Sequence, residues 1–229
     1  RVTNANMGAS LQPVWGGPVY IFRNLFLNLA ASAYKLNNDP NGFYIYHNTS
    51  ARSLGTGNWG AEAWTSLGYD QAGGYRAYAG NFEMKNNILV GLSGPARVTT
   101  DLILAEIDYN GWSPDGTFRF ANVPWDDRAD LQATSPYEAN GRILDSQTFL
   151  SPLVLPADYT TLWSDTDVRL DALSLAVDGG LALPNINDGF EGTAPDLGAV
   201  ELGDSLPAYG VRPVPDTLPP AKPTNVSVE

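Results

Sequence analysis

The segment VYIFRN at residues 19–24 recurs as FYIYHN at 43–48 and as FEMKNN at 82–87. A fourth copy, AEIDYN at 105–110, keeps apolar residues at the first and third positions and asparagine at the sixth. Strict alternation of apolar and other residues over a few positions indicates a β-strand with one buried face. The chain therefore repeats one strand and one asparagine four times.

The spacing of the copies predicts the fold. Asn24, Asn48, Asn87 and Asn110 are 24, 39 and 23 residues apart. The two short spacings match one coil of a parallel β-helix, an all-β solenoid in which neighbouring coils bury each other's apolar faces. The long spacing predicts a coil with an insertion of about 15 residues. The insertion falls within residues 52–80, a stretch rich in glycine and aromatic residues, as expected of a projecting loop.

The repeated asparagine has a structural explanation. At the bend between two strands, asparagine tolerates unusual backbone angles, and its side chain hydrogen-bonds to backbone groups. In stacked coils the amides also hydrogen-bond to one another as a ladder. We therefore expect the four asparagines to turn the coils and not to act in catalysis.

The strand period of two assigns the other side chains to faces. The apolar positions point inward, and their neighbours form three outward columns. The inward set is Val19, Ile21, Phe43, Ile45, Phe82 and Met84. The columns are Tyr20, Tyr44 and Glu83; Phe22, Tyr46 and Lys85; and Arg23, His47 and Asn86.

Beyond residue 112 the pattern fades. PWDDRADLQA at 124–133 indicates a short helix, and short apolar stretches over 167–203 indicate irregular final coils that cap the solenoid. We expect residues 1–203 to form one domain. Residues 204–229 end in a proline-rich segment that reads as a linker to a further domain. The first residues contain neither an initiator methionine nor a signal peptide, so we expect a piece of a longer polypeptide.

Composition excludes several kinds of site. The chain has 43% hydrophobic and 17% charged residues, as a globular protein does. The absence of cysteine excludes disulfides and thiolate chemistry, and the single histidine, His47, excludes a multi-histidine metal centre. No apolar run approaches the roughly 18 residues needed to cross a membrane, so we expect no membrane insertion.

The charge is unevenly distributed. Residues 1–100 hold seven Lys/Arg and four Asp/Glu, whereas residues 101–229 hold six and 21. Such an acidic half argues against nucleic acid as a partner, because phosphates are met by Lys and Arg. The acidic residues indicate either a solvated surface or calcium binding. The clusters spaced suitably for calcium ligands are Asp126, Asp127 and Asp130, and Asp165, Asp167 and Asp171, although neither is a full EF-hand loop.

With its coils laid out, the chain resembles the bacterial right-handed parallel β-helix repeat proteins of the pectate-lyase-like superfamily, and looks like the C-terminal portion of one. The resemblance is carried by GGPVYIFRN (16–24), KLNNDPNGFYIYHNTS (35–50), NNILVG (86–91) and APDLGAVELG (194–203). The last looks like the Asp-x-Gly-Ala-x-Glu ending of many such proteins. The resemblance implies a secreted protein that binds a polysaccharide on an exterior sheet face. If the protein is an enzyme, β-elimination of an acidic polysaccharide is favoured over hydrolysis.

The residues permit such binding. Tyr20, Phe22, Tyr44 and Tyr46 would form an aromatic patch for sugar rings, beside the cations Arg23 and Lys85. The alternative is that the insertion at 52–80 folds back and buries these aromatic side chains.

β-Elimination needs a cation at the uronate carboxylate and a base for the α-proton. His47 has the natural pKa for the base, with Lys35 as another candidate, and Arg76 is a candidate for gripping the carboxylate. The alternative for His47 is a hydrogen-bonded structural residue beside a ladder asparagine. A glycoside hydrolase would instead need two carboxylates about 5–10 Å apart. A non-catalytic carbohydrate-binding or adhesion module is the remaining alternative, with further domains on both sides.

Overall fold

A computed structural model describes residues 1–14, 17–38, 41–51, 62–66, 78–90, 94–98, 101–113, 118–120, 123–145, 147–151, 156, 161–163 and 167–206. These residues form three sheets and one short helix, and nearly all strand pairs are parallel. The expectation of an all-β architecture is confirmed.

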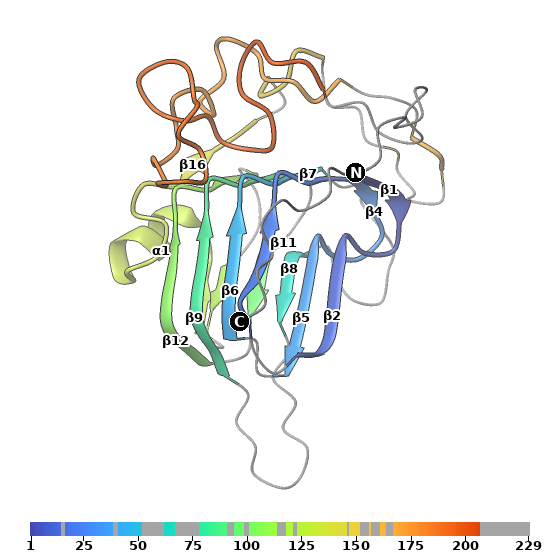
Figure 1. Cartoon of the computed structure of the whole chain (residues 1–229). Coiled ribbons are helices and arrows are strands. Elements are labelled where there is room, and N and C mark those ends of the chain that lie inside the picture. The colour runs from blue at the N-terminus through green and yellow to red at the C-terminus, as the bar shows by residue number, and fades with distance from the viewer. Residues whose placement is uncertain are drawn as a thin grey trace, which may run out of the picture.

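The strands are distributed over three sheets in a regular order (Figure 1). Sheet A contains β1 (Val2–Ala5), β4 (Leu25–Leu29), β7 (Thr49–Ala51), β10 (Ile88–Val90), β13 (Gly111–Trp112) and β16 (Arg142–Ile143). Sheet B contains β2 (Ala9–Val14), β5 (Tyr34–Asn38), β8 (Glu62–Ser66), β11 (Gly94–Val98), β14 (Phe118–Phe120) and the antiparallel β15 (Val123–Trp125). Sheet C contains β3 (Val19–Phe22), β6 (Asn41–Tyr46), β9 (Tyr78–Lys85) and β12 (Asp101–Asp108). From β1 to β12 the chain visits sheets A, B and C in turn, and one such passage is one coil.

The repeated strands are the strands of sheet C, in the predicted register. Val19 pairs with Phe43, Phe43 with Phe82, and Phe82 with Ala105. Five of the six inward positions are buried as expected, with Phe43 and Phe82 fully inaccessible to solvent, and Val19 is partly buried. They belong to one apolar core that lies between the three sheets.

The asparagine ladder is present, and its geometry differs from the prediction in one respect. The Asn48 carboxamide oxygen accepts hydrogen bonds from the backbone and side-chain nitrogens of Asn24, and the pattern repeats from Asn48 to Asn87 and from Asn87 to Asn110. However, the left-handed backbone angles belong to the residue before each asparagine. Their φ values are 52° at Arg23, 51° at His47, 60° at Asn86 and 57° at Tyr109.

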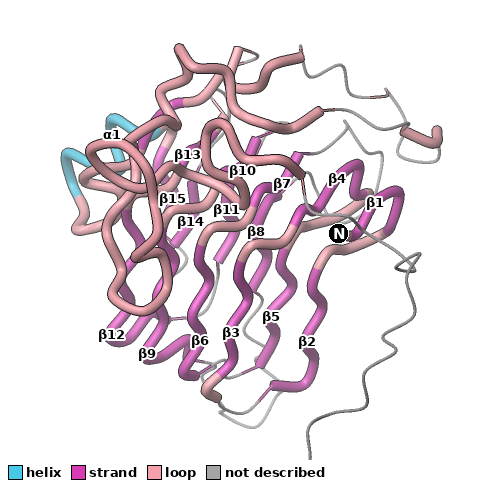
Figure 2. Tube along the Cα trace, turned by 45° about the horizontal axis from the view of Figure 1, so that its top comes forward, coloured by secondary structure: helices cyan, strands magenta, loops and turns pink. Residues whose placement is uncertain are grey.

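Sheet A is covered on both faces. Its inner face contributes to the core between the sheets, whereas Leu25, Leu27, Ile88 and Val90 face a second apolar cluster. Ala51 of β7 belongs to the same cluster, and its other buried members come from the described parts of residues 144–200, which loop over sheet A (Figures 1 and 2). A strand buried on both faces reads as a continuous apolar run, and LFLNL of β4 is buried along its whole length.

The predicted helix is α1 (Arg128–Thr134), whose first turn is capped by the Asp127 side chain accepting from the backbone nitrogen of Asp130. The predicted insertion over 52–80 contains β8, which pairs with β5 and β11 as the regular strand of its coil. Its flanks, residues 52–61 and 67–77, lie outside the described residues, as do residues 207–229 of the expected linker. Among the described residues, no helix is long and apolar enough to span a membrane.

Candidate functional site

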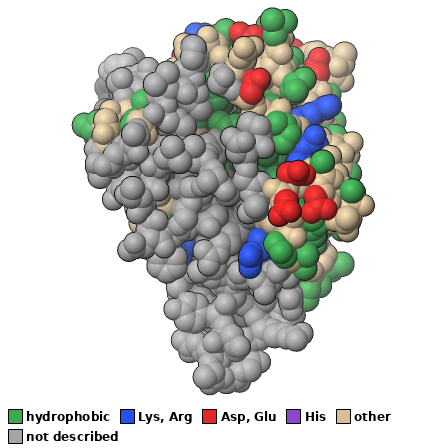
Figure 3. Space-filling model, turned by 180° about the vertical axis from the view of Figure 1, so that it is seen from behind, with side chains coloured by type: hydrophobic (Ala, Val, Ile, Leu, Met, Phe, Trp, Pro, Cys, Tyr) green, Lys and Arg blue, Asp and Glu red, His purple; other side chains and the backbone are tan. Residues whose placement is uncertain are grey.

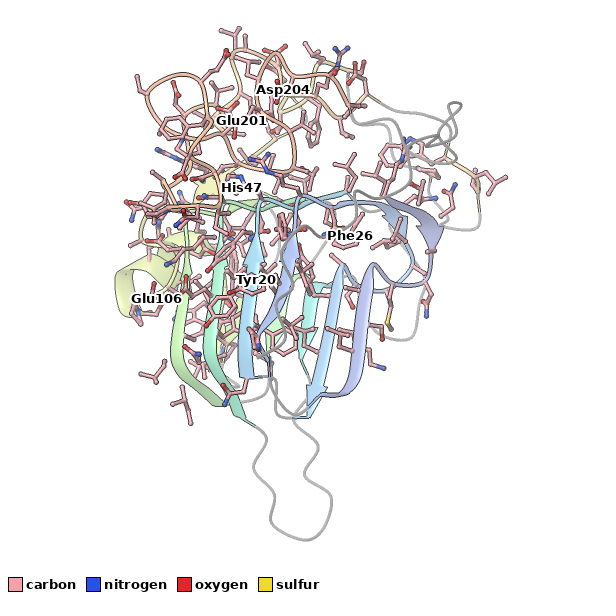
Figure 4. The ribbon with its side chains drawn as sticks, viewed as in Figure 1. Tyr20, Phe26, His47, Glu106, Glu201 and Asp204 are labelled. Atoms are coloured by element: carbon pink, nitrogen blue, oxygen red, sulfur yellow. The ribbon has the colours of Figure 1, made fainter. Side chains whose placement is uncertain are left out.

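Two columns of side chains run across the outer face of sheet C, and they follow the predicted order. The first column is Tyr20, Tyr44, Glu83 and Glu106, and the second is Phe22, Tyr46, Lys85 and Asp108. Each column therefore starts with aromatic residues on β3 and β6 and ends with charged residues on β9 and β12. Figure 4 shows Tyr20 and Glu106 on the same sheet, toward opposite ends of these columns.

The aromatic end forms a contiguous exposed group, called here the aromatic patch: Tyr20, Phe22 and Tyr44. The rings of Tyr20 and Tyr44 stack with centroids 5.0 Å apart. Tyr20 is 54% exposed and Phe22 is 49% exposed, and Tyr44 is partly exposed. Side chains of this size seldom stay this exposed in a group without a ligand or partner. The aromatic patch is thus the strongest indication of a binding surface on this sheet.

The charged end is a compact cluster, called here the Lys85 cluster: Tyr46, Glu83, Lys85 and Glu106. Lys85 Nζ lies 3.2 Å from Glu83 Oε2 and also donates to Glu106 Oε2. The Tyr46 hydroxyl donates to Glu83 Oε2 over 2.7 Å. Glu83 and Glu106 stand directly opposite on β9 and β12, where like charges repel. Lys85 offsets this repulsion by bonding to both.

The cluster holds Lys85 and Tyr46 in their protonated forms. Burial favours the neutral amine of Lys85, but its hydrogen bonds with Glu106 and Glu83 outweigh burial and raise the pKa. Burial and the hydrogen bond to Glu83 raise the pKa of the Tyr46 hydroxyl far above its usual range. Neither side chain is therefore a base near neutral pH.

His47 is buried, so the prediction that it points outward in an exposed column is wrong. Its Nδ1 lies 3.2 Å from the Gly198 carbonyl oxygen, and its Nε2 lies 3.0 Å from the Asn86 amide nitrogen and 2.8 Å from that of Asn187. The side chain has no exposed surface, because residues from the closing segment cover it. Figure 4 shows His47 where the sheets meet the overlying loops.

The contacts of His47 define its protonation state. The amide oxygens of Asn86 and Asn187 accept from the backbone nitrogens of Leu181 and Leu183, so both amide nitrogens must face the imidazole. Nε2 then accepts two hydrogen bonds, and Nδ1 carries the proton that is donated to Gly198. Burial and the charge of Arg23 lower the pKa of His47 to about 4. These contacts match the structural interpretation of His47 more closely than the catalytic one.

Among the other predicted site residues, Arg23 lies close enough to His47 for its charge to lower the histidine pKa, whereas Lys35 lies apart. Lys35 lies on β5 in sheet B, so it does not share the face of sheet C. Arg76 lies outside the described residues. Arg23 is exposed at the end of β3, where its Nη1 donates to the Ala199 carbonyl oxygen over 3.4 Å. Tyr46 and Lys85 are more buried than predicted because they pack within the Lys85 cluster.

The closing motif Asp196, Gly198, Ala199 and Glu201 docks the final segment. Gly198 has a φ of 92°, and its backbone nitrogen donates to the Asn86 carbonyl oxygen over 2.8 Å. Asp196 accepts from the backbone nitrogens of Asp178 and Leu202. Ala199 donates to the Thr49 hydroxyl over 2.9 Å. These residues therefore have structural contacts in place of an exposed site.

Three of the six acidic residues considered for calcium have local hydrogen-bond partners in the structure. Asp127 caps α1, Asp167 is bonded by Arg169 over 2.7 Å, and Asp171 accepts from the backbone nitrogen of Leu173. Within the described ranges, no group of three or more His, Asp or Glu side chains converges as a metal site. Asp165 lies outside those ranges. Figure 3 shows acidic side chains close to basic ones on the rear face, with no extended basic surface in its described part.

The sequence reasoning missed three residues of this region. Glu106 could have been added to the first column, because the fourth repeat already gave its register. Asn187 could not, because no local pattern connects it with His47. The same holds for Glu138, whose carboxyl oxygens accept from the backbone and side-chain nitrogens of Asn110 and end the ladder.

Comparisons of this chain with protein-family models, with curated proteins and with solved structures find no match.

Proposed function

We propose that the chain is a right-handed parallel β-helix that binds a polysaccharide across the outer face of sheet C. One observation carries the proposal: Tyr20 and Phe22, both about half exposed, lie beside Tyr44 on one sheet face. Aromatic rings offer flat, apolar surfaces with polar edges, which suits the faces and hydroxyls of pyranose rings. The protein would act outside the cell.

The fold part of the proposal is supported by the strand order. Strands three apart in the chain pair in parallel, with the register kept from coil to coil. Connections between parallel strands of one sheet are nearly always right-handed, because the strand twist favours that hand. An experimental structure of the chain tests the handedness directly, and a left-handed course would contradict this part of the proposal.

The described residues favour binding over β-elimination. The candidate base His47 is buried, with both ring nitrogens occupied. Lys35 lies on a different sheet. Lys85 is protonated and already bonded to two carboxylates. A lyase site built on sheet C would therefore have to draw on residues beyond the described ranges, such as Arg76.

Hydrolysis has a partial basis in Glu83 and Glu106. Opposite residues on neighbouring strands lie about 4.8 Å apart, close to the carboxylate separation of about 5 Å in retaining glycosidases. However, Lys85 Nζ contacts both carboxylates and so lies where the glycosidic bond would need to be. We therefore favour a carbohydrate-binding module over an enzyme.

A binding measurement tests the proposal. Soluble polysaccharides are tested by affinity electrophoresis and calorimetry with the wild type and the double variant Tyr20→Ala, Phe22→Ala. The matched control is Val123→Ala, because Val123 is 49% exposed, as Phe22 is, but lies on β15 in sheet B. The double variant should lose binding, and the control should keep it.

Two results would contradict the proposal. The first is that no polysaccharide in a broad panel binds, or that the double variant binds as the wild type does. The second is that a uronate polymer yields an unsaturated product absorbing in the near ultraviolet, which would show cleavage by β-elimination.

A further inference from the structure

We propose that the face of sheet C selects polysaccharides that carry protonated amines, with the Glu106 carboxylate as the group that meets the amine. This inference rests on the proposed function, because it names the substrate class of the same surface. It departs from the acidic polysaccharide that the family resemblance implies.

The chemical character of the side chains changes along the two columns. The aromatic patch on β3 and β6 is followed on β9 and β12 by the carboxylates of Glu83, Glu106 and Asp108. A sugar chain stacked on the aromatic patch and running across the strands therefore reaches carboxylates next. Uronate units placed there would face charges of their own sign.

Lys85 is already paired with two carboxylates. It is the cation within the two columns, and its side chain is only 11% exposed. Its ammonium contacts both Glu83 and Glu106. To bind a uronate it would have to leave these partners, and the two opposed carboxylates would then face each other without a cation.

Glu106 can accept a further hydrogen bond. Its side chain is 65% exposed, and Lys85 bonds to its Oε2. Its Oε1 accepts no hydrogen bond from the described part of the chain. Asp108 differs, because both of its oxygens are bonded by Asn140 and one of them also by the backbone of Tyr109. Glu106 is therefore the carboxylate that can accept from a ligand ammonium.

Arg23 is the other cation near the aromatic patch among the residues that the structure describes. Its left-handed backbone conformation follows β3, and its guanidinium donates to the Ala199 carbonyl oxygen in the overlying loops. This contact directs the charge toward the closing segment, at the end of the strand and away from Glu106. Arg23 therefore does not offset the carboxylates at the other end of the columns.

The experiment compares three oligosaccharides of equal length by calorimetry: glucosamine, N-acetylglucosamine and galacturonate oligomers. The pH is mildly acidic but above the usual glutamate pKa of about 4.3, so that amines are protonated. The variants are Glu106→Gln, Lys85→Met and, as a matched control, Glu191→Gln at an exposed carboxylate outside sheet C. Thermal melts check that each variant folds.

We expect the glucosamine oligomer to bind roughly 2- to 5-fold more tightly than its acetylated form, the range for one exposed charge pair, and galacturonate to bind most weakly. The preference should fall with added salt. It should disappear in Glu106→Gln, increase in Lys85→Met and persist in Glu191→Gln.

The outcomes separate the two proposals. If neutral oligomers bind through Tyr20 and Phe22 without any preference for the amine, the amine inference is overturned and the binding function stands. Tighter binding of galacturonate overturns the inference in the same way. If no oligomer or polymer binds at all, the inference and the proposed function both fail.

Discussion

His47 and Gly198 are joined by a hydrogen bond from the imidazole Nδ1 to the carbonyl oxygen, 3.2 Å long, although 151 residues separate them. The bond links the turn after β6 to the segment that covers sheet A. Asn187 adds a second contact from the same segment to the same ring. The single histidine of the chain therefore links the coils to the segment that covers sheet A.

Acid should weaken this link. Protonated His47 would place an N–H at Nε2 against two amide nitrogens that are also donors. Because the folded-state pKa of about 4 lies below the ordinary 6.5, the unfolded chain takes up the proton first. The contribution of neutral His47 to the free energy of unfolding is therefore complete above about pH 6.5. It is lost as the pH falls toward 4, and the loss is on the order of 3 kcal/mol. Urea unfolding at a series of pH values measures it.

The control is His47→Asn, because asparagine tolerates the left-handed backbone at this position and already precedes the ladder residue in the next coil at Asn86. The variant should be less stable at neutral pH but should lack the loss between pH 6.5 and 4. If its pH profile has the same slope as that of the wild type, another group is responsible for the loss.

A rise in pH should weaken the last rung of the ladder, where Glu138 accepts from Asn110. Burial raises the pKa of the Glu138 carboxyl to about 8, above its ordinary value, so the folded state keeps the proton that the unfolded state gives up. This contribution is complete below about pH 4.5 and lost as the pH rises to about 8, on the order of a few kcal/mol. Glu138→Gln keeps an oxygen to accept from Asn110 and carries no charge. It should be more stable than the wild type above pH 8 in chemical unfolding, and equal losses in both proteins would refute the assignment.

Gly198 should not tolerate a side chain. A Cβ at this position would lie 2.6 Å from Thr49 Oγ1 and 2.7 Å from Ile88 Cδ1, at a φ of 92°. Gly203 has a similar φ of 87° but no atom within 4 Å of such a Cβ. Gly203→Ala should therefore cost about 1 kcal/mol for the backbone alone, and Gly198→Ala about 2–4 kcal/mol through the added clash. Thermal unfolding compares them, and equal costs would mean that the segment shifts to make room.

The sequence predicts the coils well because their determinants are local. Alternation at Val19 and Ile21, repeated at Phe43 and Ile45, is enough to give the register of sheet C. Burial of His47 is not predictable in the same way, because its partners come from distant loops without a repeat. The left-handed backbone conformation of Arg23 is not predictable from the sequence either, because the position is not a glycine.

The candidate site was only partly predictable for the same reason. The columns follow from the strand period, so the neighbours of Tyr20 could be predicted. The pairing of charges depends on how side chains meet across neighbouring strands. No local sequence pattern predicts that Lys85 bonds to both Glu83 and Glu106. Lys85, predicted to bind substrate beside the aromatic patch, is therefore already paired with two carboxylates in the folded protein.

Lys85 and Glu106 should be coupled in stability. Lys85→Met leaves two opposed carboxylates on β9 and β12, so it should destabilise the fold, and added salt should restore part of the loss. In the background of Glu106→Gln the same replacement should cost less. A double-mutant cycle from urea unfolding should give a coupling of about 0.5–1 kcal/mol, because Glu106 is largely exposed. Additive effects would show that the ion pair contributes nothing.

The asparagine ladder should lose most stability where its rungs are interior. Asn87 is fully buried, and its amide nitrogen donates to the carbonyl oxygens of Ile45 and Lys85 and to Asn110. Its carboxamide oxygen accepts from both nitrogens of Asn48. Asn87→Ala leaves these partners buried and unpaired, at a cost of about 1–3 kcal/mol for each group that finds no new partner.

Asn24 is the matched control at the first rung. It is partly exposed, and its amide donates to Phe22 and Asn48. Water can replace the partners lost in Asn24→Ala, so this change should cost about 1 kcal/mol. Equilibrium unfolding and amide hydrogen exchange at Asn48 and Ile88 distinguish the two variants, because an interior break should open both neighbouring coils. If Asn24→Ala destabilises the fold as much as Asn87→Ala does, burial is not what gives the ladder its strength.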